Sequence, residues 1–149
     1  MITKKELKHL YQPDGISCGP TCLKMISDYH TDRDISINDF KNICETDNIK
    51  GTTLEDMMRG LNHINVSYQI PTLNTSEDAT RYLNNSLNSG GQVILRTLTN
   101  GIKHWIIAIE KFDTDYIVYD PWLGKLQYSK EQIINIWKPR DFHCLRITN

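Results

Sequence analysis

Helix-forming and strand-forming patterns occupy different halves of this 149-residue sequence. Before residue 90, apolar side chains recur mainly at the spacing of amphipathic helices. Four helices are expected in this half: one over residues 18–29, one that begins at residue 36, one that follows residue 53 and one over residues 76–87. A short strand is expected at residues 66–70. The strands expected in the second half cover residues 92–98, 104–111, 116–120, 125–128 and 142–147, with one helix that Ser129 caps. Helices ahead of an antiparallel sheet predict an α+β fold, with the first helix packed on the sheet.

The composition predicts one globular domain over residues 1–149, with 39% hydrophobic and 23% charged residues. A net charge of −1 and the lack of any Lys/Arg run longer than two residues argue against a nucleic acid partner. The N-terminus lacks the apolar core of a signal peptide, and the longest strongly apolar run, residues 105–109, is too short for a membrane segment. We therefore expect a cytoplasmic protein, or one exported without a cleaved signal peptide.

Loop-forming residues give way to helix-forming residues at Cys18. Proline is tolerated only in the first turn of a helix, so Pro20 places Cys18 close to a helix N-terminus. The unpaired backbone N–H groups and the positive end of the helix dipole favour thiolate over thiol at that position. Gly19 is expected to leave room for a substrate backbone beside the sulfur. Cys18 is therefore a candidate nucleophile, with a buried helix residue as the alternative.

A base and an orienting group stand at the ends of two predicted strands. His104 opens the first strand and Asp120 closes the second, and a short polar turn joins the two. Folding this hairpin brings His104 beside Asp120, which would hold the imidazole toward Cys18. A plain strand-ending turn also explains Asp120, and both explanations can hold together. The other four histidines do not stand at a strand end beside an acidic residue and are not assigned to the site: His9, His30, His63 and His143.

Gln12 lies six residues before Cys18, in a loop expected to fold back past the helix start. Its amide could donate to the oxyanion of a tetrahedral intermediate, with the backbone N–H of Cys18 as the second donor. The alternative is a solvated loop glutamine.

The other cysteines are predicted to be small core side chains: Cys22, Cys44 and Cys144. An even number of cysteines in a chain without a signal peptide is weak support for disulfides. Neither the cysteines nor the scattered histidines have metal-ligand spacing, so we expect no metal. No phosphate-binding loop is found, and no cofactor is expected.

Five stretches together resemble a known family. They are Gln12, the block Cys18-Gly19-Pro20-Thr21-Cys22-Leu23, Gly51-Thr52-Thr53-Leu54, His104 and Tyr119-Asp120-Pro121. They resemble the papain-like bacterial cysteine peptidases that process double-glycine leader peptides, usually the N-terminal part of ABC transporters that export bacteriocins. The resemblance extends from about residue 11 to 137. It implies a papain-like fold, a Cys18–His104–Asp120 triad with Gln12 as oxyanion donor, and cleavage after small residues such as Gly-Gly.

The sequence leaves several functions open. Because no transporter follows residue 149, we expect a free-standing peptidase that hydrolyses a peptide or protein substrate. One alternative is a toxin or effector that uses the same triad for acyl transfer, deamidation or cleavage of a host macromolecule. Another is an inactive module that only binds a peptide. An immunity protein or an exporter would be the partner in the first two cases.

Overall fold

The computed structural model describes residues 6–149 of the protein, and every predicted element is present there. The helices are α1 (Cys18–His30), α2 (Ile37–Ile43), α3 (Leu54–His63), α4 (Ser76–Asn88), α5 (Lys130–Trp137) and the 3-10 helix η1 (Lys138–Arg140). The strands are β1 (Tyr68–Gln69), β2 (Val93–Thr99), β3 (Ile102–Phe112), β4 (Asp115–Asp120), β5 (Gly124–Ser129) and β6 (Cys144–Ile147). The predicted α+β class is confirmed.

Most strand bounds differ from the prediction by one or two residues, and β3 begins at Ile102, so that His104 is its third residue and does not open it. The strand expected at 66–70 contains only the two residues of β1. The last strand begins at Cys144 and not at Phe142, because Asp141 and Phe142 have φ angles of 56° and 57°. Backbone in this left-handed region cannot continue a strand.

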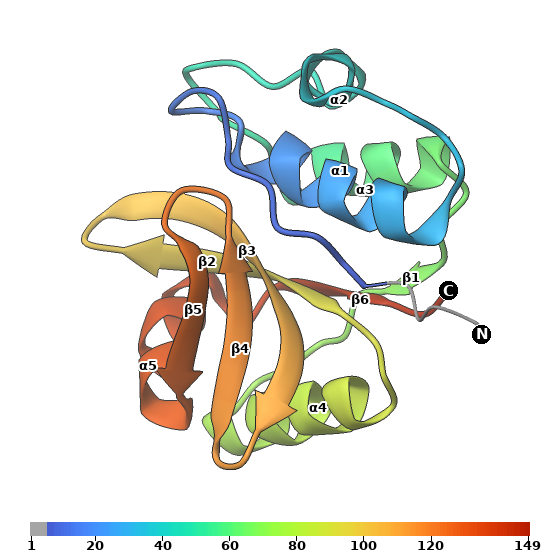
Figure 1. Ribbon diagram of the computed structural model, residues 1–149. Coiled ribbons are helices and arrows are strands. Elements are labelled where there is room, and N and C mark those ends of the chain that lie inside the picture. Colours follow the sequence, from blue (N-terminus) through green and yellow to red (C-terminus); the bar gives the residue numbers. More distant parts are fainter. Residues whose placement is uncertain (1–5) are drawn as a thin grey trace, which may run out of the picture.

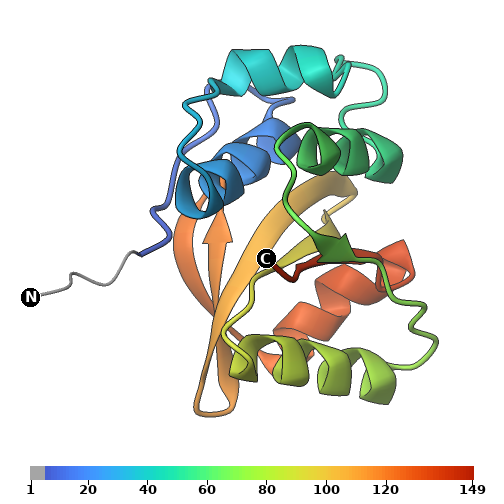
Figure 2. The same cartoon turned by 90° about the vertical axis from the view of Figure 1, so that its right-hand side faces the viewer.

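All six strands form one antiparallel sheet in the order β1-β6-β2-β3-β4-β5. Its two faces are covered by different helices: α1, α2 and α3 lie on one side, and α4 and α5 on the other (Figures 1 and 2). Side chains of β3 point alternately to the two faces of the sheet. Trp105 and Ile107 belong to the core between the sheet and α1–α3, while Ile106 and Ala108 belong to the core between the sheet and α4 and α5. The predicted packing of the first helix on the sheet is confirmed.

The three cysteines predicted to be structural are fully buried and free: Cys22, Cys44 and Cys144. The Cys22 thiol also donates to the carbonyl of Trp105 over 3.5 Å, which ties α1 to β3. Burial raises the pKa of Cys44 and of Cys144 to about 12, so both thiols stay protonated and unreactive. None of the helices within residues 6–149 is both long and apolar enough to cross a membrane.

Gly19 serves close packing and does not leave space for a substrate, contrary to the expectation from sequence. A Cβ atom at this position would lie 2.8 Å from Cβ and 2.9 Å from Oγ1 of Thr52, and 3.0 Å from Sδ of Met57. The loop before α3 therefore presses directly against the first turn of α1. The indole N–H of Trp105 fastens the same loop by donating to the Thr52 carbonyl over 2.9 Å.

Gly19→Ala should destabilise the protein by about 1–3 kcal/mol, because a methyl group must displace Thr52 and Met57 in a packed interior. Urea denaturation measures the change. Gly15→Ala is the matched control, since a Cβ atom at Gly15 meets nothing within 4 Å. Equal stability of the two variants would contradict the packing role of Gly19.

Candidate active site

The loop before α1 leaves the N-terminus of that helix open. Of the five α-helices within residues 6–149, α1 alone has an N-cap residue whose side chain does not accept from the first turn. The N-cap is Ser17, whose hydroxyl donates instead to Oδ1 of Asp14 over 2.6 Å. The N–H groups of the first turn, including that of Cys18, therefore have no side-chain cap.

The carboxylate of Asp14 shapes this loop. Its Oδ1 also accepts from the backbone N–H of Ile16 at 3.0 Å, and its Oδ2 accepts from Nζ of Lys41 at 2.9 Å. The hydrogen bond from Ser17 is the main reason that the pKa of Asp14 falls to about 2, against the opposing effect of burial. The Asp14 carboxylate, ionised at neutral pH, thus holds the loop against Lys41 of α2.

The β3–β4 hairpin brings His104 and Asp120 together as predicted. Nε2 of His104 donates to Oδ1 of Asp120 over 2.7 Å, and the two side chains are only 16% and 5% exposed. The same oxygen accepts from the backbone N–H groups of Trp122 and Leu123, at 2.7 and 3.1 Å. With Nε2 engaged by the carboxylate, Nδ1 of His104 is the ring nitrogen left for chemistry.

Burial would lower the pKa of His104, but two partners outweigh it. The hydrogen bond to Asp120 and the hydrogen-bonding and charge interactions with Cys18 raise this pKa from 6.5 to about 9. For Asp120, burial would raise the pKa, and the bond to His104 with those from Trp122 and Leu123 lowers it below the ordinary value. The geometry thus favours a cationic imidazole beside the Asp120 carboxylate.

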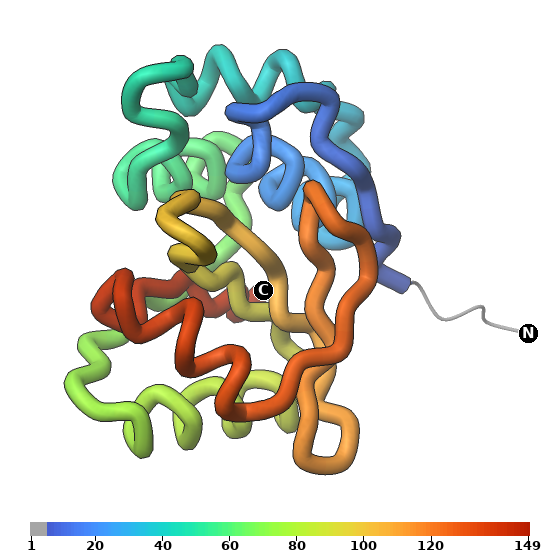
Figure 3. Tube along the Cα trace, turned by 90° about the vertical axis from the view of Figure 1, so that its left-hand side faces the viewer, coloured from blue at the N-terminus to red at the C-terminus, as the bar shows by residue number. Residues whose placement is uncertain are grey.

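An unpredicted contribution comes from the N-terminal segment, residues 6–17, which runs along the β4–β5 turn (Figure 3). Nε2 of His9 donates to the backbone carbonyl of Asp120 over 2.7 Å, and the backbone N–H of Gln12 donates to the backbone carbonyl of Pro121 over 2.8 Å. The phenol of Tyr11 occupies the space where a Cβ of Gly124 would lie. No local signal indicated these contacts, because they join residues more than 100 positions apart.

Gln12 lies in the cleft beside Cys18, as predicted. One N–H of its amide donates to the carbonyl of Asp14 over 2.6 Å, while its Oε1 is buried without a partner among the described residues. The amide is therefore fixed in position, with its second N–H still available as a donor.

All four residues predicted for the site line one cleft of about 440 Å³: Gln12, Cys18, His104 and Asp120. The lining of the cleft also includes three apolar side chains that are more than half exposed: Ile102, Trp122 and Leu123. Exposed apolar side chains that gather beside reactive groups are typical of a substrate-binding cleft.

A helix-tip thiol, a buried His–Asp pair and a cleft define the class of the papain-like cysteine peptidases. Residues 6–140 match the model described as the Peptidase C39 family. The match covers most of the chain, so the protein belongs to the Peptidase C39 family and is a cysteine peptidase. Curated proteins include no sequence that matches it.

Solved structures agree with the predicted papain-like fold. The peptidase domain of Streptococcus ComA, a bi-functional ABC transporter involved in quorum sensing, has a TM-score of 0.76 at 16% identity, covering 95% of this chain and 96% of that one. A double glycine motif protease from an AMS/PCAT transporter, solved with its leader peptide, has a TM-score of 0.76 at 12% identity, covering 97% and 94%. A putative C39-like peptidase from Bacillus anthracis has a TM-score of 0.75 at 11% identity, covering 97% and 96%.

His104 should titrate near pH 9 in the wild type, and at lower pH in Asp120→Asn, which removes the charge while keeping an acceptor oxygen. Because the pKa is raised on folding, the stability that this proton contributes is fully present below pH 6.5 and is lost as the pH rises to about 9. The imidazole signals in NMR spectra report the titration. A midpoint near 6.5 in both proteins would contradict the role of Asp120.

Proposed function

We propose that this protein hydrolyses peptide bonds with Cys18 as nucleophile, His104 as general acid and base, and Asp120 as the group that orients His104. The observation that carries the proposal is the buried 2.7 Å hydrogen bond between His104 and Asp120, in a cleft that also contains Cys18. Since Nε2 of His104 faces the carboxylate, Nδ1 is the atom assigned to proton transfer.

The proposed reaction has two halves. The Cys18 thiolate attacks the carbonyl carbon of the scissile bond, and the amine leaves with a proton that His104 supplies, so that a thioester remains on Cys18. A water molecule then gives a proton back to His104 and attacks the thioester, which releases the carboxylic acid and regenerates the thiolate–imidazolium pair.

We further assign the oxyanion of the tetrahedral intermediate to two donors, the backbone N–H of Cys18 and the amide of Gln12. The first is supported by the open N-terminus of α1, where Ser17 does not take up the N–H groups. The second is supported by the fixed Gln12 amide, which has one unused N–H. The hydrogen bond that this amide donates to the Asp14 carbonyl keeps it in place before any substrate arrives, which is the arrangement that stabilises developing charge most effectively.

For the substrate we propose a peptide that is cut after small residues such as Gly-Gly. Support comes from the family and from the leader peptide bound to the double glycine motif protease of similar fold. An immunity protein or an exporter as partner, and a toxin or effector role, stay predictions from the sequence.

A proteome-derived peptide mixture should acquire new termini when digested with the wild type and none with Cys18→Ala, because the variant lacks the nucleophile. Mass spectrometry of the termini identifies both the cleaved bond and its sequence context. Cys22→Ala is the matched control, since this second cysteine of α1 is fully buried and should leave the cleaved bonds unchanged. New termini that persist in Cys18→Ala would refute Cys18 as the nucleophile.

Gln12→Ala should lower kcat by on the order of a hundredfold through loss of one oxyanion donor. Alkylation of Cys18 by iodoacetamide forms no oxyanion, so its rate should stay within about twofold of the wild type. If both rates fell together, Gln12 would act on the thiol or on the loop, and the oxyanion role would be wrong.

A further inference from the structure

His9 binds the backbone of the residue that orients His104. Its Nε2 donates to the carbonyl of Asp120 over 2.7 Å, whereas Nε2 of His104 donates to the side-chain Oδ1 of the same residue, also over 2.7 Å. Asp120 is therefore bound by two imidazoles, one at its backbone and one at its carboxylate. Only the hydrogen bond from His104 was expected from the sequence.

The β-sheet alone does not fix the backbone at Asp120. The pairing of β4 with β3 ends at Tyr119, opposite Ile107, so Asp120 lies one residue beyond that ladder. On its other side Asp120 forms the last pair with β5. The peptide group that joins Asp120 to Pro121 has no N–H, because proline lacks one, so its carbonyl is the only group through which hydrogen bonds can hold it. His9 supplies the donor for that carbonyl.

Neighbouring side chains fix the ring of His9 in turn. It meets the rings of Tyr11 and Tyr119 edge to face, with centroid distances of 4.5 and 5.6 Å. Tyr119 belongs to the core between the sheet and α1–α3, and so does Leu7, two residues before His9. The donor is therefore presented by a ring that is half-buried and packed on two sides.

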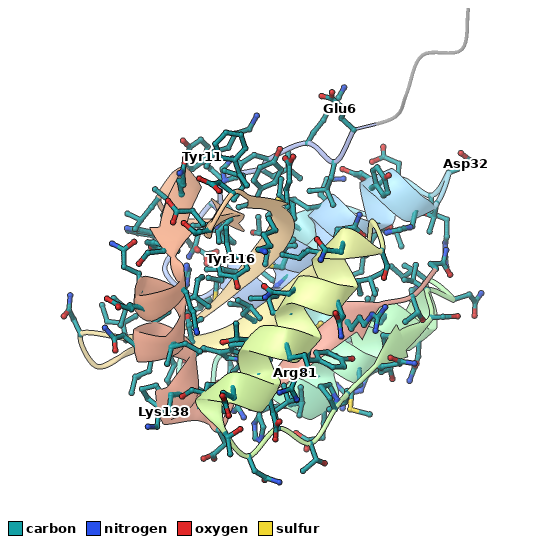
Figure 4. All side chains as sticks on the ribbon, turned by 90° about the horizontal axis from the view of Figure 1, so that it is seen from below. Glu6, Tyr11, Asp32, Arg81, Tyr116 and Lys138 are labelled. Atoms are coloured by element: carbon teal, nitrogen blue, oxygen red, sulfur yellow. The ribbon has the colours of Figure 1, made fainter. Side chains whose placement is uncertain are left out.

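The N-terminal segment also carries the proposed oxyanion donor. The backbone N–H of Gln12 donates to the carbonyl of Pro121 over 2.8 Å, so this one segment binds two consecutive carbonyls of the β4–β5 turn, at positions 120 and 121. Figure 4 shows Glu6 and Tyr11 of the segment on one side of the molecule, apart from Lys138 at the end of α5. The segment thus joins the oxyanion donor to the turn that carries the carboxylate.

A carbonyl that is fixed in place also restricts the carboxylate of Asp120, because both groups are attached to the same Cα atom. Oδ1 must meet the ring of His104 and the backbone N–H groups of Trp122 and Leu123 at the same time. Hydrogen bonds weaken steeply when they are misaligned, and a catalytic group displaced by about 1 Å can cost about a hundredfold in rate. Release of the Asp120 carbonyl would therefore loosen the hydrogen bond that orients His104.

We propose that His9 is a positioning residue of the peptidase reaction: it fixes the backbone of Asp120, so that the carboxylate holds Nδ1 of His104 toward Cys18. The proposal rests on the proposed peptidase function and adds to it a residue that does not line the cleft.

The first test separates the donor of His9 from the bulk of its side chain. His9→Leu keeps an apolar side chain of similar size and removes the donor, whereas His9→Gln keeps an N–H that can reach the same carbonyl. With a peptide that the wild type cleaves, His9→Leu should lower kcat about tenfold, as expected for one lost hydrogen bond, and should change KM by less than about twofold. His9→Gln should restore most of kcat.

His63→Leu is the matched control for this test, since His63 is exposed at the end of α3 and should leave kcat unchanged. Equal losses of kcat in His9→Leu and His9→Gln, or no loss in either, would overturn the positioning role and leave the peptidase function intact.

The second test does not depend on cleavage. NMR follows the titration of the His104 imidazole, whose midpoint lies near pH 9 in the wild type, and the ionisable partners Asp120 and Cys18 are intact in every variant. His9→Leu should lower this midpoint, because a carboxylate that is held less firmly stabilises the cation less, while His9→Gln and His63→Leu should keep it.

A loss of stability in His9→Leu on urea denaturation, together with an unchanged midpoint of His104, would mean that His9 only packs and would refute the proposal. If the wild type cleaves no peptide at all, the proposed function fails, and the midpoint of His104 alone decides whether His9 positions the pair.

Discussion

One carboxylate oxygen, Oδ1 of Asp120, organises the centre of the molecule. It accepts from the His104 ring and from the backbone N–H groups of Trp122 and Leu123, and its residue is nearly inaccessible to water. A buried carboxylate is stable only when such donors surround it, and these donors come from β3 and from the β4–β5 turn. The hydrogen bonds that stabilise the charge of Asp120 therefore also fix the conformation of the turn and the orientation of the imidazole. The exposed Trp122 and Leu123 owe their positions on the cleft wall to the same oxygen.

The opposite half of the site depends on packing. Cys18 stands at the tip of α1, and α1 is placed by the core that it shares with β3 and α3. Thr52 contacts Gly19 and accepts from the Trp105 indole, so a single residue joins the first turn of α1 to the strand that begins near His104. The N-terminal segment completes the arrangement through His9 and Gln12, whose bonds to residues 120 and 121 fasten the predicted oxyanion donor to the turn that carries Asp120.

Features encoded by neighbouring residues were predictable from the sequence. The N-caps Thr53 and Ser129 both form capping boxes, as their spacing to Asp56 and Gln132 indicates, and Ser36 accepts from Asp39 without the return bond. The hairpin that pairs His104 with Asp120 follows from two adjacent strands and a short turn. Contacts between distant segments were not predictable, because His9 and Thr52 carry no local mark of their partners. Gly19 shows the same limit. The sequence indicated that its lack of a side chain matters, but not that Thr52 and Met57 fill the space beside it.

The side chain of Ser17 has a consequence for any attempt to make this protein more robust. By turning to Asp14 it forgoes a cap that is typically worth about 1 kcal/mol to a helix. Because Pro20 has no N–H, a restored cap could accept only from the N–H of Gly19, and Ser17 would have to release Asp14 to reach it. The loop that holds the Gln12 amide through the Asp14 carbonyl would then be less firmly fixed. Thermal tolerance and turnover are thus set against each other at a single serine, and a variant selected for heat resistance alone would be expected to lose rate there.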